Sequence, residues 1–257
     1  MKKYLIGTSW KMNKTLGEAL DYCAILAKGG PLPDRLQPFV IPPFTAVREV
    51  TRALQRAGLN CLTGVQNMHF ADRGAFTGEI SPLMVKDTGA TLVEMGHSER
   101  REFFGETNET VRLKAAAALS HGLTPLICIG DSLQEKCWGV SKETVIRQMK
   151  AALAGLRPEQ VAGVIIAYEP IWAIGEQGVP ATPEEAQAIH RQLYHALAES
   201  YGAEIADRVP LLYGGSVNHD NALTLLALDH VDGLFVGRAA WEGESYRRLL
   251  DTIAATL

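Results

Sequence analysis

The sequence has few cysteines, no long apolar run and no excess of basic residues. Its four cysteines among 257 residues fit neither a metal motif nor a disulfide framework, so we expect reduced thiols, a cytoplasmic location and no metal site. The net charge of −4, without a basic stripe, argues against nucleic acid as a partner. No apolar run approaches the roughly 20 residues that a membrane helix needs, and no low-complexity linker divides the chain.

What the sequence does contain is a regular alternation of short apolar runs and amphipathic segments. The apolar runs predict strands at residues 4–8, 37–41, 61–65, 91–95, 124–129, 163–168, 209–213 and 233–236. Strands that alternate with helices form parallel sheets, and eight such units predict an α/β fold, a (β/α)8 barrel forming a single domain over residues 1–257. The alternative, a doubly wound open sheet, needs a glycine-rich turn after the first strand, which GTSWK at 7–11 does not supply.

Several of the predicted helices have recognisable first residues. Thr15 with Glu18, and Thr182 with Glu185, have the spacing of a capping box, in which each side chain bonds the other residue's backbone N–H. Thr45 is expected to cap the helix after the second strand. A long polar loop is expected at residues 66–79, between the third strand and its helix.

Five of the predicted strands are followed closely by a residue that could bind or react. These residues are Lys11, His97, Glu169, Ser216 and Gly237. In a barrel, the carboxyl ends of all strands meet at one mouth, where active sites lie. Each residue also has a plainer interpretation, namely a solvated lysine, a structural histidine, an acid that caps or pairs, and two tight turns.

Glu169 stands at the tip of a strand beneath an unusually apolar loop. The loop carries Ile171, Trp172 and Ile174, which a loop that stays in water does not need. A segment of this kind is typical of a lid that closes over a ligand. Burial under such a lid raises the pKa of a carboxylate and makes it a stronger base.

His97 and Lys11 are the expected partners of that acid. His97 begins a short helical segment whose dipole disfavours the imidazolium, so a neutral ring can donate a hydrogen bond to a carbonyl. Lys11 would attract an anionic substrate and stabilise negative charge that develops during reaction. Glu99 is expected to orient Lys11 or His97, and Cys128 to be buried packing.

Two glycine-containing turns predict an anion site. Gly214, Gly215 and Ser216 follow the seventh strand, and Gly237 with Arg238 follows the eighth. Phosphate sites in barrels of this kind commonly use the loops after these two strands, where backbone N–H groups are free to bind. The plainer interpretation is that both are only tight turns.

Four motifs resemble those of the triosephosphate isomerase family. They are WKMN at 10–13, GHSERR at 96–101, YEPIWAIG at 168–175 and YGGSV at 213–217. The resemblance covers essentially the whole chain, in order. It implies proton transfer on a phosphorylated α-hydroxycarbonyl sugar without a metal or cofactor, in a homodimer whose loop 66–79 inserts beside the neighbour's Lys11.

The resemblance also implies a role for each matching residue. Glu169 would move a proton between adjacent carbons, neutral His97 would move protons between the two oxygens, and Lys11 would hold the anion. Loop 170–181 would close so that water is excluded and phosphate is not eliminated. The groups expected around the phosphate are Gly175, Ser216, Gly237 and Arg238, with Ser98 and Glu99 as supporting residues.

Three departures from the family pattern suggest a larger substrate. Ser9 stands where the family usually has asparagine, which opens space beside the reacting carbons. The loop sequence GEQGVPA at 175–181 is one residue longer than usual, and Arg238 replaces a glycine. With GTSWK at 7–11 and GLFVGR at 233–238, the chain resembles relatives that interconvert L-erythrulose 1-phosphate and D-erythrulose 4-phosphate in erythritol use.

Other functions remain open at this point. The chain could act on triose phosphates in glycolysis, or it could be an inactive barrel that only binds a sugar phosphate. Lys11 could also form a Schiff base, as in an aldolase-like barrel. Activity on four-carbon and three-carbon substrates, and trapping with borohydride, separate these possibilities.

Overall fold

The strands of the protein close into a barrel. The computed structural model describes residues 3–175 and 178–257. Within these residues, eight parallel strands pair in chain order and β8 returns to pair with β1. The strands are β1 (Tyr4–Ser9), β2 (Leu36–Ile41), β3 (Leu62–Val65), β4 (Leu92–Met95), β5 (Thr124–Ile129), β6 (Ile165–Tyr168), β7 (Leu211–Tyr213) and β8 (Gly233–Phe235). The predicted (β/α)8 fold is therefore confirmed, and the doubly wound sheet is wrong.

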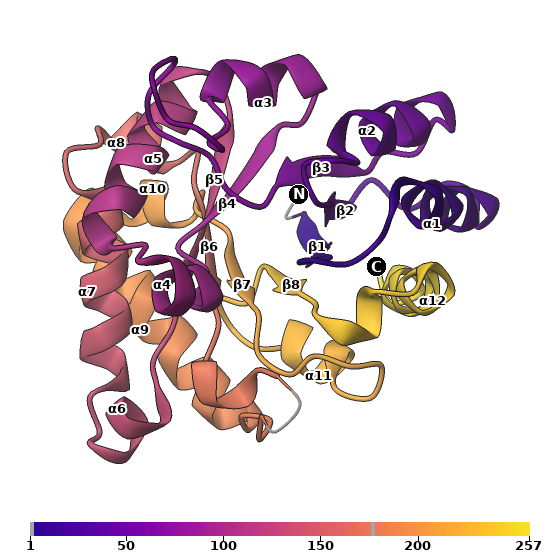
Figure 1. The fold of residues 1–257 in the computed structure, drawn as a ribbon. Helices are drawn as coiled ribbons and strands as arrows, with labels where there is room; N and C mark the ends of the chain where they lie inside the picture. Colours follow the sequence, from indigo (N-terminus) through magenta and orange to yellow (C-terminus); the bar gives the residue numbers. More distant parts are fainter. Residues whose placement is uncertain (1–2, 176–177) are drawn as a thin grey trace.

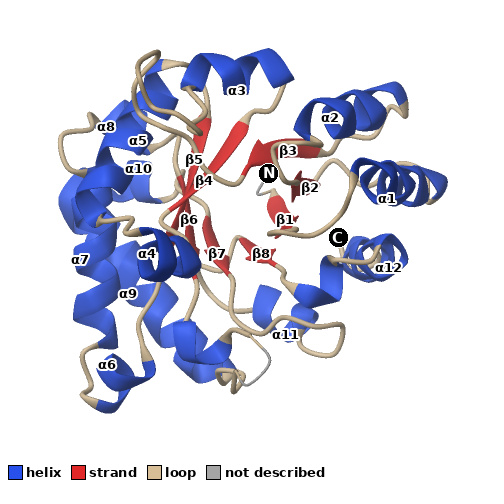
Figure 2. Ribbon diagram, in the orientation of Figure 1, coloured by secondary structure: helices blue, strands red, loops and turns tan. Residues whose placement is uncertain are grey.

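Helices surround the strands on the outside of the barrel (Figures 1 and 2). The helical segments are α1 (Leu16–Lys28), α2 (Val47–Arg56), α3 (Pro82–Thr88), α4 (Ser98–Phe104), α5 (Asn108–Ser120), α6 (Leu133–Cys137), α7 (Ser141–Leu153), α8 (Pro158–Val161), η1 (Ile171–Ala173), α9 (Pro183–Tyr201), α10 (Ala203–Ala206), α11 (Ala222–Leu226), η2 (Arg238–Ala240) and α12 (Gly243–Ala254). The first helix, α1, and the last, α12, lie side by side in Figure 1, where the barrel closes. In the described part of the chain, no helix is long and apolar enough to cross a membrane.

The helix caps predicted from the sequence form at two helices, but the cap predicted for a third helix does not form. Capping boxes form at Thr15 and at Thr182, as predicted. Thr45 does not cap α2, because Ala46 is the N-cap residue and no side chain caps this end. The backbone N–H of Ala46 instead donates to the carbonyl of Pro43 at 2.9 Å, so a turn occupies the predicted first residues of this helix.

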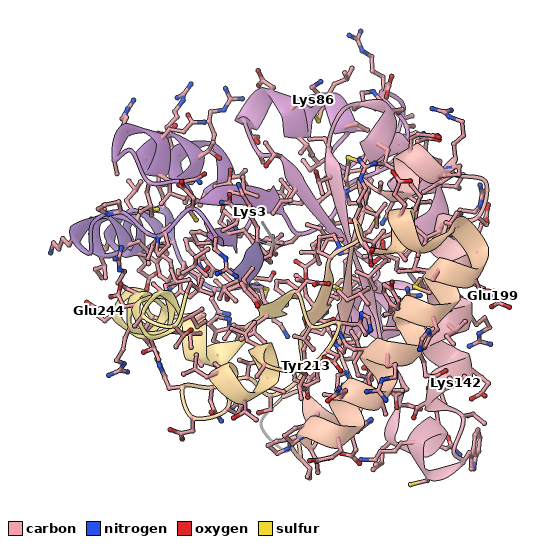
Figure 3. The ribbon with its side chains drawn as sticks, turned by 180° about the vertical axis from the view of Figure 1, so that it is seen from behind. Lys3, Lys86, Lys142, Glu199, Tyr213 and Glu244 are labelled. Atoms are coloured by element: carbon pink, nitrogen blue, oxygen red, sulfur yellow. The ribbon has the colours of Figure 1, made fainter. Side chains whose placement is uncertain are left out.

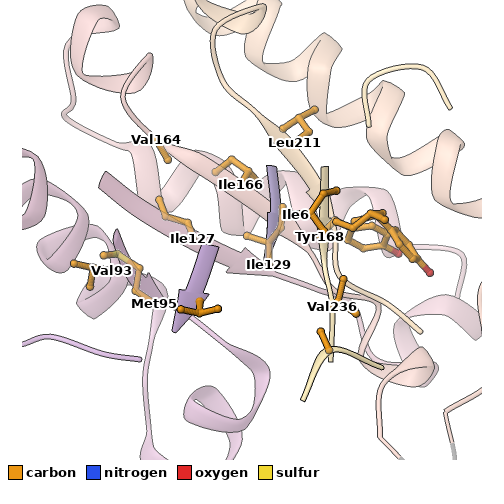
Figure 4. Packing of buried hydrophobic residues seen from close by; sticks show 14 of the residues in the cluster. Ile6, Val93, Met95, Ile127, Ile129, Val164, Ile166, Tyr168, Leu211 and Val236 are labelled. Atoms are coloured by element: carbon orange, nitrogen blue, oxygen red, sulfur yellow. The ribbon is translucent and has the colours of Figure 1, made fainter. Parts of the chain in front are cut away.

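Apolar side chains fill two layers of the molecule. Alternate residues of the strands point into the barrel, where the rings of Phe39 and Phe235 lie with centroids 5.7 Å apart. The other strand residues belong to a second, larger cluster outside the barrel, of which Ile127 and Ile166 are shown in Figure 4. Full burial of each such side chain is worth roughly 1.5–3 kcal/mol. The barrel is thus a packed core and not a pore, and only its ends can hold a ligand.

Charged side chains mark the outer surface of the helices. Seen from behind, Lys142 on α7 and Glu199 on α9 project outward, whereas Tyr213 lies inside the molecule (Figure 3). Lys142 and Glu199 are exposed and Tyr213 is buried. The charged residues that face inward, described below, are therefore exceptions to the general pattern of this chain.

Candidate active site

A cavity of about 390 Å³ gathers the residues singled out in the sequence. The predicted site residues that line it are Ser9, Lys11, His97, Glu99, Glu169, Gly175, Ser216, Gly237 and Arg238. Ser98 is not among the described residues that line the cavity, although it is the first residue of α4 and follows His97 directly. Lys11 and Gly237 are 226 positions apart in the sequence, and the barrel brings them to one mouth because both follow the ends of neighbouring strands.

Glu169 is held inside this cavity by backbone contacts on both sides. Its N–H donates to the carbonyl of Ile129 at 2.8 Å. The chain at Gly214 passes so close that a Cβ atom there would lie 2.7 Å from Cγ of Glu169, which only glycine avoids. The side chain is almost fully buried, and Oε2 has no hydrogen-bond partner among the described residues. A buried carboxylate oxygen without a partner is poised to accept a proton from a ligand.

The surroundings of Glu169 make it a stronger base than an ordinary carboxylate. Burial is the main cause, and the nearby carboxyl group of Glu94 adds to it, while the positive charge of Lys11 opposes both. Together they raise the pKa of Glu169 to about 8. The desolvation expected from the apolar loop in the sequence thus has a structural counterpart.

His97 has a defined tautomer. It is the N-cap residue of α4, and its Nδ1 atom accepts a hydrogen bond from the backbone N–H of Glu99 at 3.2 Å. The proton of the neutral ring is therefore on Nε2, which lies 3.8 Å from Oε2 of Glu169. Burial, followed by the charge of Lys11, lowers the pKa of His97 to about 4, so the ring is neutral near pH 7.

Lys11 is fixed in an unfavourable backbone conformation. Its φ angle is 53°, which costs on the order of 1 kcal/mol for a residue with a side chain. The amide of Gln66 donates to the Lys11 carbonyl at 2.8 Å and supports this conformation. The ammonium group donates to Oε1 of Glu99 at 2.6 Å, so Glu99 contacts both Lys11 and, through its backbone, His97. Strain of this kind is common where a side chain must be aimed at a ligand.

The loops after β7 and β8 form a further part of the cavity wall. Asn221 donates to the carbonyl of Ser216 at 2.8 Å, which fixes the first of these loops. The guanidinium of Arg238 donates to the carbonyl of Gly175 at 2.8 Å. Arg238 therefore connects the loop after β8 to the apolar loop, a contact that the sequence did not predict.

The apolar loop after β6 is tied to the barrel at its first residues. Oη of Tyr168 and Nε1 of Trp172 both donate to the carboxylate of Asp131, at 2.9 and 3.1 Å. Asp131 is fully buried and follows the end of β5. Glu176 and Gln177, which belong to the predicted lid at 170–181, lie outside the described residues.

Three polar residues that support the site were missed in the sequence. Gln66 and Asp131 follow the ends of β3 and β5 and could have been found by applying the strand-end rule to every strand. Glu94 is different, because it lies within the apolar strand β4. Only one feature of the sequence could have identified it, namely a single carboxylate within an apolar run that is typical of a buried strand. In the described residues, no group of three or more His, Cys, Asp or Glu side chains is placed to hold a metal ion.

The chain is similar to known proteins over nearly its whole length. The family model for triosephosphate isomerase matches residues 4–253. Among curated proteins, L-erythrulose-1-phosphate isomerase of Rhizobium rhizogenes is 51% identical over 99% of this chain and 96% of its own. The enzymes of the same name from Brucella abortus and Mycolicibacterium smegmatis are 53% and 54% identical, each over 97% of this chain and over 96% and 93% of their own.

Proposed function

The chain belongs to the triosephosphate isomerase family, and we propose that it interconverts L-erythrulose 1-phosphate and D-erythrulose 4-phosphate through an enediolate. One observation carries the chemistry. Glu169 and His97 both line the cavity, and the buried Oε2 of Glu169, which has no hydrogen-bond partner among the described residues, lies 3.8 Å from the protonated nitrogen of His97. A base and a neutral hydrogen-bond donor this close can act on two adjacent carbons and their oxygens.

The first half of the proposed reaction forms the enediolate. The Glu169 carboxylate takes the proton from C3 of L-erythrulose 1-phosphate, and the electrons of that C–H bond form a double bond between C3 and C2. The C2 carbonyl oxygen becomes an oxyanion. Lys11 and Nε2–H of His97 stabilise this charge in a site that is largely buried.

The second half delivers a proton from Glu169 to the other carbon. His97 donates its Nε2 proton to the oxygen on C2 and takes up the proton from the oxygen on C3. The electrons on that oxygen form the new C3 carbonyl, and Glu169 delivers its proton to C2. No atom is gained or lost, the ring of His97 is neutral again at the end, and the product is D-erythrulose 4-phosphate.

The phosphate is assigned to the part of the cavity wall formed by the loops after β6, β7 and β8. Gly175, Ser216, Gly237 and Arg238 line the cavity there, and we assign their backbone N–H groups to the phosphate. Backbone donors in glycine-rich turns bind phosphate oxygens well, because no side chain blocks the approach. Closure of the loop that contains Gly175 would exclude water and keep the enediolate from losing phosphate.

The four-carbon substrate is favoured by two findings. The relatives at 51–54% identity carry the name L-erythrulose-1-phosphate isomerase. Ser9, at the edge of the cavity, is smaller than the asparagine that the family usually has there. A triose phosphate ends at the reacting carbon, whereas a tetrulose phosphate carries one more hydroxymethyl group, which we place beside Ser9 because Ser9 lines the cavity.

Purified protein assayed on both substrates tests the proposal. We expect a larger kcat/KM for L-erythrulose 1-phosphate than for dihydroxyacetone phosphate or glyceraldehyde 3-phosphate. Reaction in D2O should place deuterium on the carbon that Glu169 reprotonates. A larger kcat/KM for the triose phosphates would favour a glycolytic triosephosphate isomerase. Lack of turnover on any of these substrates, with retained binding, would favour an inactive sugar-phosphate barrel.

Two variants sharpen this experiment. Glu169→Gln keeps the shape of the side chain but removes the base, so activity should fall by about 10²–10⁴-fold while binding of the sugar phosphate is kept. Glu159→Gln, at an exposed glutamate on α8, is the matched control and should leave activity unchanged. Borohydride should trap no adduct on Lys11, and a covalent adduct would instead indicate aldolase-type chemistry.

We further propose a homodimer formed through loop 66–79. In this loop, His69 stacks between Phe70 and Phe76, with ring centroids at 4.3 and 4.1 Å, and Phe76 remains 47% exposed. An exposed aromatic cluster on a protruding loop suits insertion into a second copy. Phe76→Glu should shift sedimentation toward the monomer, while Trp138→Glu, at the exposed tryptophan that directly follows α6, should not.

The cellular setting follows from the same resemblance. We place the protein in the cytoplasm, in the use of erythritol-type sugars, with no cofactor, no nucleic-acid partner and no membrane association. Growth of a deletion strain on erythritol and on glucose tests this setting. A defect on erythritol alone supports it, and a defect on glucose alone would indicate the glycolytic alternative.

A further inference from the structure

Glu94 is a carboxyl group inside the barrel that the reaction described above does not use. It lies in β4 between Val93 and Met95, which both pack outward against the helices. Side chains alternate along a strand, so Glu94 points inward, like Leu92 two residues before it in the interior cluster. The residue is only 3% exposed. A buried carboxyl group in an apolar layer is costly, so a functional reason for it is expected.

The partner of Glu94 is a residue of the active-site cavity. Oγ of Ser9, the last residue of β1, donates to Oε2 of Glu94 at 2.7 Å, and this bond is buried. Ser9 lines the cavity, and its carbonyl accepts a hydrogen bond from Nε1 of Trp241 at 3.0 Å. Both the backbone and the hydroxyl of Ser9 are therefore fixed. Because its proton is directed to Glu94, the hydroxyl has only lone pairs left to offer a ligand.

We propose that Ser9 and Glu94 form a specificity element that recognises the terminal hydroxyl group of a four-carbon sugar phosphate. The hydroxyl at the end of the substrate donates to Oγ of Ser9, and Glu94 is a positioning residue that keeps Ser9 an acceptor. This inference rests on the proposed function and adds Glu94 to it. Ser9 is where the cavity was already inferred to have room for the extra hydroxymethyl group.

Because Ser9 donates to Glu94, its oxygen can accept a hydrogen bond from the substrate, so the small size of Ser9 is not the only feature that selects the four-carbon sugar. A small apolar residue at position 9 would leave the same room but no acceptor, and the substrate hydroxyl would lose its hydrogen bond on leaving water. A triose phosphate has no group at this place and gains nothing from the acceptor. Sites built to bond a hydroxyl group discriminate strongly against a ligand that lacks it.

Three single variants and one double variant test the proposal on two substrates. Ser9→Ala removes the acceptor, Glu94→Leu removes the group that orients it, and Glu94→Gln keeps an oxygen that can accept from Ser9. We expect Ser9→Ala and Glu94→Leu each to lower kcat/KM for L-erythrulose 1-phosphate by about 10- to 100-fold, mainly through KM. For dihydroxyacetone phosphate, with every protein assayed at a pH where its kcat/KM has levelled off, the change should stay within about threefold.

The double variant and the amide variant separate a specific role from a structural one. Ser9→Ala combined with Glu94→Leu should be no worse than either change alone, because the two residues act as a unit. Glu94→Gln should restore most of the activity that Glu94→Leu loses. Equal losses on both substrates, additive losses in the double variant, or no rescue by Gln would overturn the proposal. Circular dichroism and thermal melting exclude misfolding as the cause.

The wild-type protein distinguishes failure of this inference from failure of the proposed function. If the wild type does not turn over L-erythrulose 1-phosphate, the proposed function is wrong, and the inference falls with it. If the wild type is active on that substrate and the variants lose activity equally on both substrates, only the role of Ser9 and Glu94 is wrong.

Discussion

Nδ1 of His97 accepts a hydrogen bond from the backbone N–H of Glu99, across the first turn of α4. This contact uses one of the N–H groups that have no partner within a helix, and it leaves the ring proton on Nε2. A protonated ring would need a proton on Nδ1, where the peptide N–H already points. The geometry therefore opposes protonation for a reason that is independent of burial.

The first prediction concerns this tautomer. Nitrogen NMR of the labelled protein should show His97 as the neutral Nε2–H form from about pH 5.5 to 9, because its pKa is lowered to about 4. His219 is a suitable internal reference, since its ring lies elsewhere, bonded to Ser245. Titration of His97 between pH 6 and 7 would contradict the assigned geometry.

The second prediction concerns the pH dependence of the reaction. The base must be deprotonated to act, and the pKa of Glu169 is raised to about 8 in the free protein. We therefore expect kcat/KM to rise as pH increases and to level off above about 8. A phosphate monoester also titrates, with a second pKa of about 6, so a rise in kcat/KM limited to that region would contradict the prediction.

The effect of Glu94 on this profile is a separate measurement. The charge of Glu94 is the second largest cause of the raised pKa of Glu169. In Glu94→Gln this charge is absent, so the rise in kcat/KM should move to lower pH. An unchanged profile would mean that Glu94 is neutral throughout the range or is screened from Glu169.

Much of the site could be predicted because, in a barrel of parallel strands, a residue that directly follows a strand in the sequence lies at the mouth of the barrel. Lys11, His97 and Glu169 each follow a strand, and the fold alone then places them at one mouth. Contacts between side chains of different strands do not follow from that rule. The bond from Ser9 to Glu94 joins residues 85 positions apart, and it depends on which residues of β1 and β4 share a layer inside the barrel.

The ends of helices were predictable only where the signal was local. The capping boxes at Thr15 and Thr182 use residues three apart, and both form. Thr45 had the right residue type but follows Pro42 and Pro43, and the turn that closes on Pro43 delays the helix. The contact between Arg238 and Gly175 could not be predicted either, because the two residues are 63 positions apart and no local sequence pattern indicates that they meet.

The third prediction concerns the connection between Arg238 and the apolar loop. Arg238→Ala removes the hydrogen bond to the carbonyl of Gly175, whose N–H is assigned to the phosphate. The loop should then be ordered less well around the ligand, and KM should rise by about 3- to 10-fold with a smaller change in kcat. Arg248→Ala, at an exposed arginine on α12, is the matched control. Equal effects of the two changes on KM would indicate a general loss of positive charge.

The fourth prediction concerns the effect of Glu94 on stability. Burial raises its pKa to about 7, above the ordinary value of 4.5 that it regains on unfolding. The folded protein therefore holds this proton more tightly than the unfolded chain does. The stabilisation from this difference is complete below about pH 4.5, is lost as the pH rises, and is gone above about pH 7.

Glu94→Leu removes this dependence together with the cost of burying the carboxylate. The free energy of unfolding of the variant, minus that of the wild type, should therefore be larger at pH 8 than at pH 5, by on the order of 1–3 kcal/mol. Urea unfolding of both proteins at the same concentration and at the two pH values measures the difference, in which other titrating groups largely cancel. A gain in stability at pH 8 combined with loss of the four-carbon activity would show that the barrel keeps a destabilising carboxylate for recognition of its substrate. A stability difference that is the same at both pH values would show that Glu94 keeps one protonation state throughout, and its raised pKa would then be wrong.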